Sequence, residues 1–124
     1  MHGPKWDDLL LEFYDGVPGK WIRTDSTTAE TIKYVANAYL ASKISFFNES
    51  WRVCNHLGVD PDLVAEAVAL DPRIGAYGVH GGHPFGGACL PNDLEAFVTF
   101  LTNVNELQCR LLKAVQEANR RKER

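Results

Sequence analysis

A long stripe of apolar side chains runs through the first half of the chain. Thr27-Thr28-Ala29-Glu30 has the pattern of a capping box at the start of a helix, and Gly58 has the place of a C′ glycine that ends one. Between them, apolar residues recur every three or four positions, as on one face of an α-helix, and these are Ile32, Val35, Ala36, Tyr39, Leu40, Phe47, Trp51 and Cys54. We predict one helix of about eight turns, from about Thr27 to His56. A helix of that length needs neighbours along its whole length, which favours a second subunit packed against it.

Three shorter helices are expected to follow. Asp60-Pro61 combines an N-cap with a first-turn proline, and Asp71-Pro72 ends that helix. A third helix is expected to begin near Pro91, and a fourth to open at Asn105 and run to the C-terminus. Residues 75–89, between the second and third helices, contain six of the ten glycines and are expected to form a loop.

The N-terminal residues precede the long helix and have a different pattern. We expect a short helix at residues 7–14, a turn at residues 16–19 and a brief strand at residues 20–24. The predicted fold class is therefore mainly α, with one long helix, three shorter helices, a Gly-rich loop and a short N-terminal helix-strand segment.

Composition narrows the class of protein. The 124 residues are enough for one domain with a modest core, and 45% hydrophobic with 23% charged residues is ordinary for a soluble globular chain. A net charge of −3 does not favour a nucleic-acid partner. Nothing resembles a membrane span or a signal peptide. Three scattered cysteines predict free thiols in a reducing cytoplasm.

The first candidate for chemistry is the end of the glycine-rich loop. Gly86 and Gly87, which follow Phe85, let the backbone approach a ligand closely. Cys89 is expected just before a helix, where the positive end of the helix dipole favours a thiolate. Asp93, one turn later, could hold or deprotonate a water molecule. Taken alone, this pattern favours a buried structural cysteine over a catalytic one.

Lys33 and Asn37 form the second candidate. They are four residues apart on the predicted long helix, so they share a face. Both donate hydrogen bonds to a developing negative charge, although an exposed lysine beside an incidental asparagine is the commoner reading. His80 and His83 raise the question of a metal, but the spacing lacks the usual companion ligands, and we predict no metal site. No GxGxxG turn is present, so no dinucleotide-binding fingerprint is found.

Three segments, taken together, resemble signatures of a known family. They occur in the family's order and at about its spacing: residues 28–49 (TAETIKYVANAYLASKISFFNE), 70–75 (LDPRIG) and 85–93 (FGGACLPND). They are similar to the central helical domain of the UDP-glucose/GDP-mannose dehydrogenase family. The resemblance implies that residues 1–25 are a remnant of the end of a dinucleotide-binding domain and that residues 26–124 are the central, dimerisation domain.

The resemblance also implies a reaction. The family oxidises the primary alcohol of a UDP- or GDP-sugar to a carboxylate with two NAD, through a thiohemiacetal and a thioester on a cysteine. The nucleophile aligns with Cys89, the anion-stabilising pair with Lys33 and Asn37, and the carboxylate that assists water with Asp93. The residues implied to bind substrate are Arg73, Phe85, Gly86 and Gly87. Of these, Arg73 is implied to reach the site of the partner subunit. The chain departs from the family pattern at Asn92, where a lysine is usual.

Several expectations follow for the chain as a whole. We expect a homodimer that lacks the dinucleotide-binding and nucleotide-sugar-binding domains, does not bind NAD by itself and is inactive alone. One alternative is a stand-alone dimerisation or regulatory module without turnover. Another is a metal- or thiol-based sensor that uses Cys89, His80 and His83.

Overall fold

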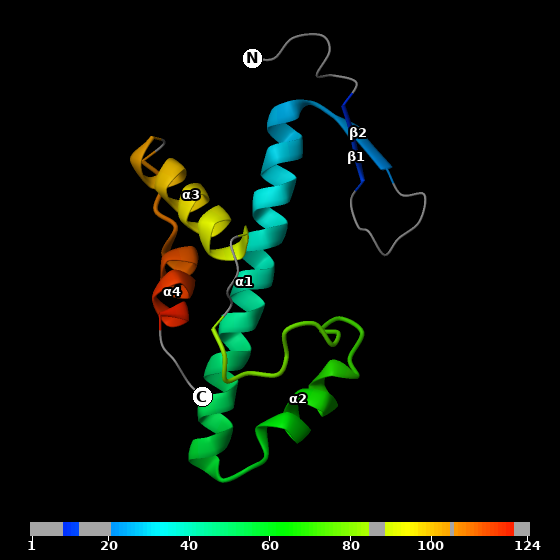
Figure 1. The fold of residues 1–124 in the computed structure, drawn as a ribbon, viewed down its shortest axis with the longest axis vertical. Helices are drawn as coiled ribbons and strands as arrows, with labels where there is room; N and C mark the ends of the chain where they lie inside the picture. The colour runs from blue at the N-terminus through cyan, green and yellow to red at the C-terminus, as the bar shows by residue number, and fades with distance from the viewer. Residues whose placement is uncertain (1–8, 13–20, 85–88, 105, 121–124) are drawn as a thin grey trace. The chain divides into compact units, whose positions relative to one another are not determined.

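The computed structural model of the 124-residue chain describes residues 9–12, 21–84, 89–104 and 106–120. The chain divides into two compact units, residues 1–36 and 37–124. The described elements are two strands and four helices, so the mainly α prediction is confirmed (Figure 1). The predicted domain boundary after residue 25 stays a prediction.

Helix α1 (Ser26–Leu57, 32 residues) is the predicted long helix, with both ends within a residue of expectation. The predicted capping box at Thr27 is wrong, because Asp25 caps the helix. The Asp25 carboxylate accepts a hydrogen bond from the Thr28 N–H at 2.7 Å, and the Asp25 C=O accepts the first helical bond, from Ala29, at 3.0 Å. A carboxylate can satisfy the N3 amide as well as a hydroxyl can, so the helix begins earlier than the Thr27 pattern suggested.

Gly58 ends α1 in the predicted way. Its φ is +76°, its N–H donates to the Asn55 C=O at 3.3 Å, and the Val59 N–H donates to the Cys54 C=O at 3.0 Å. This pair of bonds is the Schellman motif, which satisfies carbonyls that the helix leaves free. Helix α2 (Pro61–Ala69) then starts as expected, with the Asp60 side chain accepting from the Asp62 N–H at 3.0 Å.

The last two helices depart from expectation at their first residues. Helix α3 (Cys89–Asn103) begins before Pro91, so Cys89 is its first residue. Helix α4 (Arg110–Asn119) does not open at Asn105. Glu106 has a φ of +56°, and the Leu107 N–H donates to the Leu101 C=O at 2.8 Å, so this stretch closes the end of α3 instead of starting α4.

The N-terminal residues correct one prediction. Strand β1 (Leu9–Glu12) pairs antiparallel with strand β2 (Trp21–Thr24), so the helix expected at residues 7–14 is wrong, and the strand expected at residues 20–24 is confirmed. Three consecutive leucines carry no helical period, and pairing with a neighbouring strand satisfies their backbone groups.

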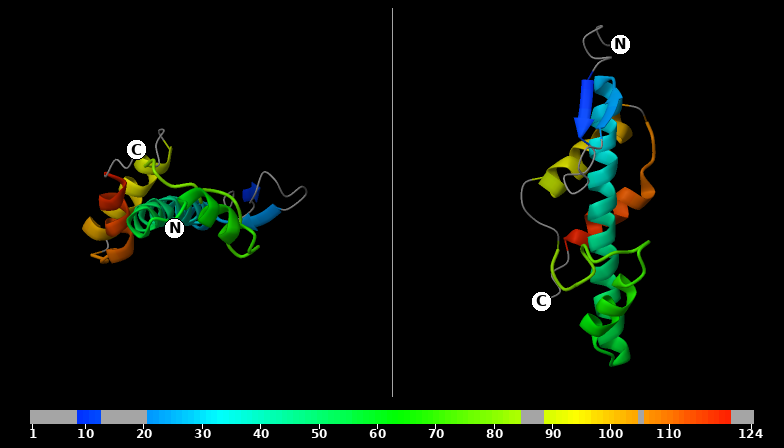
Figure 2. Two further views of the ribbon diagram at one scale, coloured as in Figure 1. Left: turned by 90° about the horizontal axis from the view of Figure 1, so that it is seen from below. Right: turned by 90° about the vertical axis from the view of Figure 1, so that its right-hand side faces the viewer.

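Two apolar clusters hold the second unit together. One joins the middle of α1 to α3 and α4, and its buried members are Ala38, Ala41, Leu94, Val98 and Val115. The other joins the later part of α1 to α2 and the following loop, and its buried members are Phe47, Ala65 and Val79. Figures 1 and 2 show α3 and α4 together on one side of α1 and α2 on the other. Helix α1 therefore contributes residues to both clusters.

Candidate functional site

The structure brings two of the predicted site residues into direct contact. The Asn37 side-chain amide on α1 donates to the Asp93 carboxylate on α3, with 2.7 Å between Nδ2 and Oδ2. Both side chains are partly buried. Leu94, the next residue, is 2% exposed and belongs to the cluster that joins these helices. Packing of Leu94 therefore fixes the place from which Asp93 meets Asn37.

Cys89 lies one helical turn before Asp93, as the first residue of α3. The N-terminal end of an α-helix carries a partial positive charge that favours anions and thiolates. The Cys89 side chain is outside the described residues, and so are Phe85, Gly86 and Gly87. What the structure supplies is the order of the two groups along one helix, the cysteine at the end and the carboxylate one turn in.

Lys33 lies on α1 one turn before Asn37, so the two share a helix face as the spacing predicted. Its side chain is exposed, and it belongs to the first of the two compact units. Its proposed role at an oxygen anion stays a prediction.

Arg73 is held in a local ion pair. Its Nε and a terminal nitrogen reach the two Asp71 carboxylate oxygens at 3.1 Å and 2.8 Å, and its backbone N–H donates to the same carboxylate at 2.9 Å. The side-chain hydrogen bond from Arg73, followed by the backbone one, lowers the pKa of Asp71, and the same contact raises the pKa of Arg73. The Arg73 side chain is 88% exposed, so its guanidinium faces outward from the chain.

A largely apolar groove of about 560 Å³ lies between α1, α4 and the segment around Arg73. Large side chains on its walls are unusually open to solvent: Tyr39 is 59% exposed, Phe46 65% and Leu111 69%. The Lys43 ammonium crosses from α1 to donate to the Ile74 carbonyl, which ties the groove's far wall to the helix. An apolar surface of this kind is typical of a site that another surface covers.

Sequence reasoning missed Asn48, which organises the glycine-rich loop. It is 7% exposed, and its amide oxygen accepts hydrogen bonds from the Gly82 N–H at 2.7 Å and the His83 N–H at 3.2 Å. Its amide nitrogen donates to the His83 C=O at 2.7 Å. A signal was present: Asn48 falls within the apolar stripe, directly after Phe47 and one turn after Ile44, where a polar residue must find partners if it is buried.

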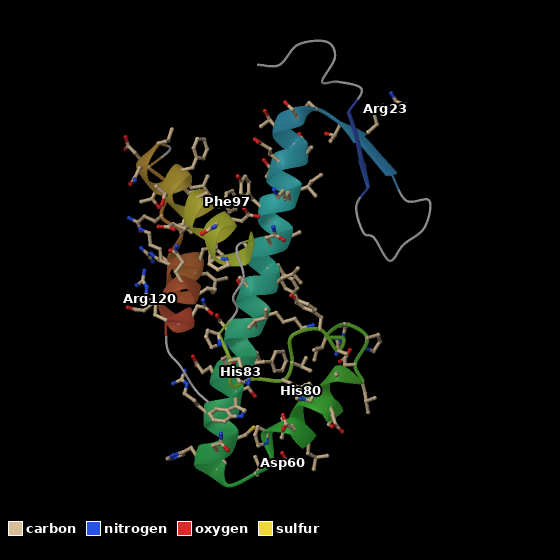
Figure 3. The ribbon with its side chains drawn as sticks, viewed as in Figure 1. Arg23, Asp60, His80, His83, Phe97 and Arg120 are labelled. Carbon is tan, nitrogen blue, oxygen red and sulfur yellow. The ribbon has the colours of Figure 1, made fainter. Side chains whose placement is uncertain are left out.

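The two loop histidines turn to different elements. His83 lies beside α1, while the His80 ring is 3.1 Å from the Asp62 carboxylate on α2 (Figure 3). Among the described residues, no group of three or more possible ligands is placed to hold a metal ion. Within the same residues, no helix is both long enough and apolar enough to cross a bilayer.

Comparison with known proteins identifies what the chain is similar to. The sequence model for the central domain of the UDP-glucose/GDP-mannose dehydrogenase family matches residues 27–121. The chain is 37% identical over 115 residues to a UDP-glucose 6-dehydrogenase of Rickettsia conorii, covering 92% of this chain and 26% of that protein. It is 43% identical over 97 residues to a UDP-glucose 6-dehydrogenase of Bacillus subtilis, covering 78% and 22%.

A solved structure extends the likeness to the fold. The UDP-glucose dehydrogenase of Pyrobaculum islandicum aligns with a TM-score of 0.73 at 42% identity, covering 78% of this chain and 22% of that one. The chain thus spans about a quarter of the length of the relatives it matches. With a family match over most of its residues and a shared fold, the chain belongs to the UDP-glucose/GDP-mannose dehydrogenase family.

Proposed function

We propose that this chain is the central domain of a nucleotide-sugar dehydrogenase and supplies its cysteine half-site. The complete enzyme would oxidise the primary alcohol of a UDP- or GDP-sugar to a carboxylate with two NAD. The observation that carries the proposal is the 2.7 Å hydrogen bond between Asn37 and Asp93, one turn along α3 from Cys89. A thiol with a carboxylate one turn along the same helix, and an amide donor bonded to that carboxylate, are groups that formation and hydrolysis of a thioester require.

The covalent steps can be assigned to groups of this chain. The Cys89 thiolate adds to the aldehyde carbon of the half-oxidised sugar, forming a C–S bond and leaving the negative charge on oxygen. Lys33 and Asn37 donate hydrogens to that oxygen. Loss of hydride converts the adduct to a thioester. Water then attacks while Asp93 takes one of its protons, the C–S bond breaks, and Cys89 leaves as a thiolate. The carboxylic acid that results loses the second proton to solvent.

Asn37 can serve both partners at once. A side-chain amide carries two hydrogens, and one of them is used by Asp93 Oδ2. That bond orients the carboxylate; its Oδ1 would take the proton from water, and the second amide hydrogen would donate to the oxygen anion. The pairing therefore supports a single site with two tasks.

NAD, the hydride acceptor that the family implies, does not fit the described residues. A dinucleotide is held where a glycine turn follows a strand and opens a helix, with the pyrophosphate at the helix N-terminus. In the described part of the chain, β2 leads through Asp25 into α1, and the Asp25 carboxylate caps that N-terminus. A negative side chain in the pyrophosphate's place repels it, so we assign NAD binding to another domain.

Transplantation tests the proposal. Residues 27–121 would replace the matching segment of the Pyrobaculum islandicum enzyme, and NADH formation would be followed with UDP-glucose, GDP-mannose and UDP-N-acetylmannosamine. We expect turnover that is lost in Cys89→Ser, and a sugar thioester that accumulates on the protein, by intact mass, in Asp93→Asn. Cys109→Ala is the control, because Cys109 also precedes a helix but has no carboxylate–amide pair assigned to it. Full activity in Cys89→Ser would refute the assignment.

The 124-residue polypeptide alone is expected to give no turnover, since the family's reaction needs a dinucleotide held near the sugar. The same assay on the isolated chain checks this. Robust NADH formation that Cys89→Ala abolishes would show that expectation to be wrong.

The apolar groove favours a homodimer as the assembly in which the domain works. Covering Tyr39, Phe46 and Leu111 with a second copy would remove large apolar surfaces from water. Phe46→Glu is expected to turn a dimer into a monomer in sedimentation at micromolar concentration. Leu70→Glu, at a site 84% exposed on α2's C-cap, is the control. A wild-type monomer would refute the dimer and leave the chemistry of Cys89 untouched.

A catalytic thiolate also requires a reducing compartment, and so we place the enzyme in the cytoplasm.

A further inference from the structure

We propose that Asp71 is a positioning residue that fixes the Arg73 guanidinium with N–H groups free to bind oxygen atoms of the nucleotide sugar. The inference rests on the proposed function, because it takes Arg73 as a residue that reaches this substrate. Asp71 acts on the substrate only through Arg73. Its carbonyl accepts two hydrogen bonds and its carboxylate accepts three, all of them from residues 73–75.

The turn that carries Arg73 is closed by Asp71. The Asp71 C=O accepts the Ile74 N–H at 2.8 Å and the Gly75 N–H at 3.0 Å, and the Asp71 carboxylate accepts the Arg73 N–H at 2.9 Å. Pro72, inside the turn, restricts its own φ. Gly75 leaves the turn with a φ of +73°, which residues with a side chain rarely adopt. The backbone under Arg73 therefore has little freedom.

The same turn is anchored to α1. The Lys43 ammonium donates a hydrogen bond to the Ile74 C=O. The Ile74 side chain packs against the buried cluster that joins α1 to α2 and the following loop. Arg73 directly precedes Ile74 and is one of the residues that line the apolar groove, over which a second copy is proposed to pack. The turn therefore holds Arg73 at a fixed place beside that groove.

Asp71 occupies one edge of the Arg73 guanidinium. Nε and one terminal nitrogen donate to the two carboxylate oxygens at 3.1 Å and 2.8 Å. A guanidinium has five N–H donors in a planar fork, and this contact uses two of them. The others include a pair, one on each terminal nitrogen, that can donate to two ligand oxygens at once. The contact thus fixes the plane of the group while leaving a binding edge.

Folding stability does not account for this arrangement. The Arg73 side chain is 88% exposed, and exposed ion pairs add little to stability, because water already solvates both charges and the pair must be ordered. An ordered guanidinium does favour binding, since a long side chain that is already fixed loses less conformational entropy when a ligand arrives. The geometry therefore favours recognition as the role of the pair.

Two explanations of Asp71 predict opposite effects of its removal. A carboxylate beside an arginine weakens the positive field that attracts an anion. By charge alone, removing it should therefore tighten the binding of a nucleotide sugar, whose diphosphate is negative. If Asp71 instead fixes the guanidinium, removing it should weaken binding. The direction of the change distinguishes the two explanations.

The first measurement is NMR relaxation at the arginine Nε atoms of the full 124-residue chain. Arg110 is the internal reference, because its Nε donates to the neutral Gln108 side chain, at 3.2 Å. We expect an order parameter for Arg73 Nε near that of rigid backbone, about 0.85, and one below about 0.6 for Arg110. Asp71→Ala should lower the Arg73 value to that of Arg110. A wild-type Arg73 as mobile as Arg110 would overturn the inference.

The second measurement is steady-state kinetics with UDP-glucose in the chimera of the Pyrobaculum islandicum enzyme. We expect Asp71→Ala to raise KM roughly two- to tenfold, the factor that corresponds to ordering one long side chain on binding, and to leave kcat within about twofold of wild type. A purely structural role would lower the melting temperature and leave KM unchanged. Glu66→Ala, which removes an exposed carboxylate from α2, is the control and should keep the wild-type KM.

A double variant tests whether Asp71 acts through Arg73. In an Arg73→Ala background, Asp71→Ala should raise KM no further, because the two residues act as one unit. An unchanged or lower KM in Asp71→Ala alone would overturn the role of Asp71 and leave Arg73 as a substrate contact. A wild-type KM in Arg73→Ala would overturn the role of both residues. Neither result bears on Cys89, whose part in the reaction is decided by the loss of turnover in Cys89→Ser.

Discussion

Replacing Leu94 with alanine should destabilise the chain far more than any surface change. Leu94 is 2% exposed and is the largest fully buried side chain among the described residues. Two of its cluster neighbours, Ala38 and Ala41, are small residues on α1. Their side chains cannot extend into the space that Leu94 would leave, so collapse of the cavity would require movement of helix backbone.

The size of the effect follows from that rigidity. Buried Leu→Ala changes cost about 2–5 kcal/mol, and the upper part of that range belongs to sites that cannot collapse. We expect a loss of about 3–4 kcal/mol at Leu94, a large share of the roughly 5–15 kcal/mol that stabilises a domain. For a chain of this length, the melting temperature should fall by roughly 10–15 °C.

Urea denaturation followed by circular dichroism measures the change, at one fixed protein concentration because association adds to apparent stability. Leu70→Ala is the matched control, since Leu70 is 84% exposed and should change stability by less than about 0.5 kcal/mol. Equal losses in Leu94→Ala and Leu70→Ala would refute the packing of α3 against α1 and, with it, the placement of Asp93.

Three further predictions concern helix ends and one ion pair. Asp25→Ala should cost about 1 kcal/mol and speed hydrogen exchange at the Thr28 amide, whereas Asp25→Asn should cost less because an amide oxygen also caps. Gly58→Ala should cost about 1 kcal/mol in urea titration, purely from its φ of +76°, because nothing lies within 4 Å of the added Cβ. A carbon-detected NMR titration should find the pKa of Asp71 below its ordinary value of 3.8, and rising toward it in Arg73→Gln, which removes the side-chain hydrogen bond but keeps the backbone one. Since the folded pKa is lowered, any stability from this pair is present above pH 3.8 and is lost as the pH falls through the lowered value; an unchanged Asp71 titration in Arg73→Gln would contradict it.

The helices that could be predicted were those with strong periodicity and strong end signals. The long stripe and Gly58 gave α1 to within a residue at each end, and Asp60-Pro61 gave the start of α2. Where two end signals competed, the sequence did not rank them: a carboxylate at Asp25 and hydroxyls at Thr27 and Thr28 can all cap. In the folded chain the Asp25 carboxylate is the group that accepts the Thr28 N–H, so the helix starts after Asp25.

The site was less accessible to sequence reasoning than the helices. Spacing placed Lys33 and Asn37 on one face, but no local rule joins Asn37 to Asp93 across 56 residues; only the family resemblance put them together. Asn48 was overlooked because a search for apolar periodicity ignores a polar residue that falls within the stripe. Its burial and its hydrogen bonds to the loop depend on tertiary structure, which local sequence patterns do not report.

The two apolar clusters on α1 differ in how much chain must close before each can form. The Phe47–Val79 cluster spans 32 residues, whereas the cluster that includes Ala38 and Val115 spans 77. Short closures cost less entropy and are made sooner, so α2 and the loop should dock on α1 before α3 and α4 arrive. Pulsed hydrogen exchange during refolding would show this as earlier protection at Ala65 than at Val98, and the reverse order would contradict it. The loop as far as His83 would then already lie against α1 when α3 and α4 fold, so these two helices would pack onto a part of the domain that has already formed.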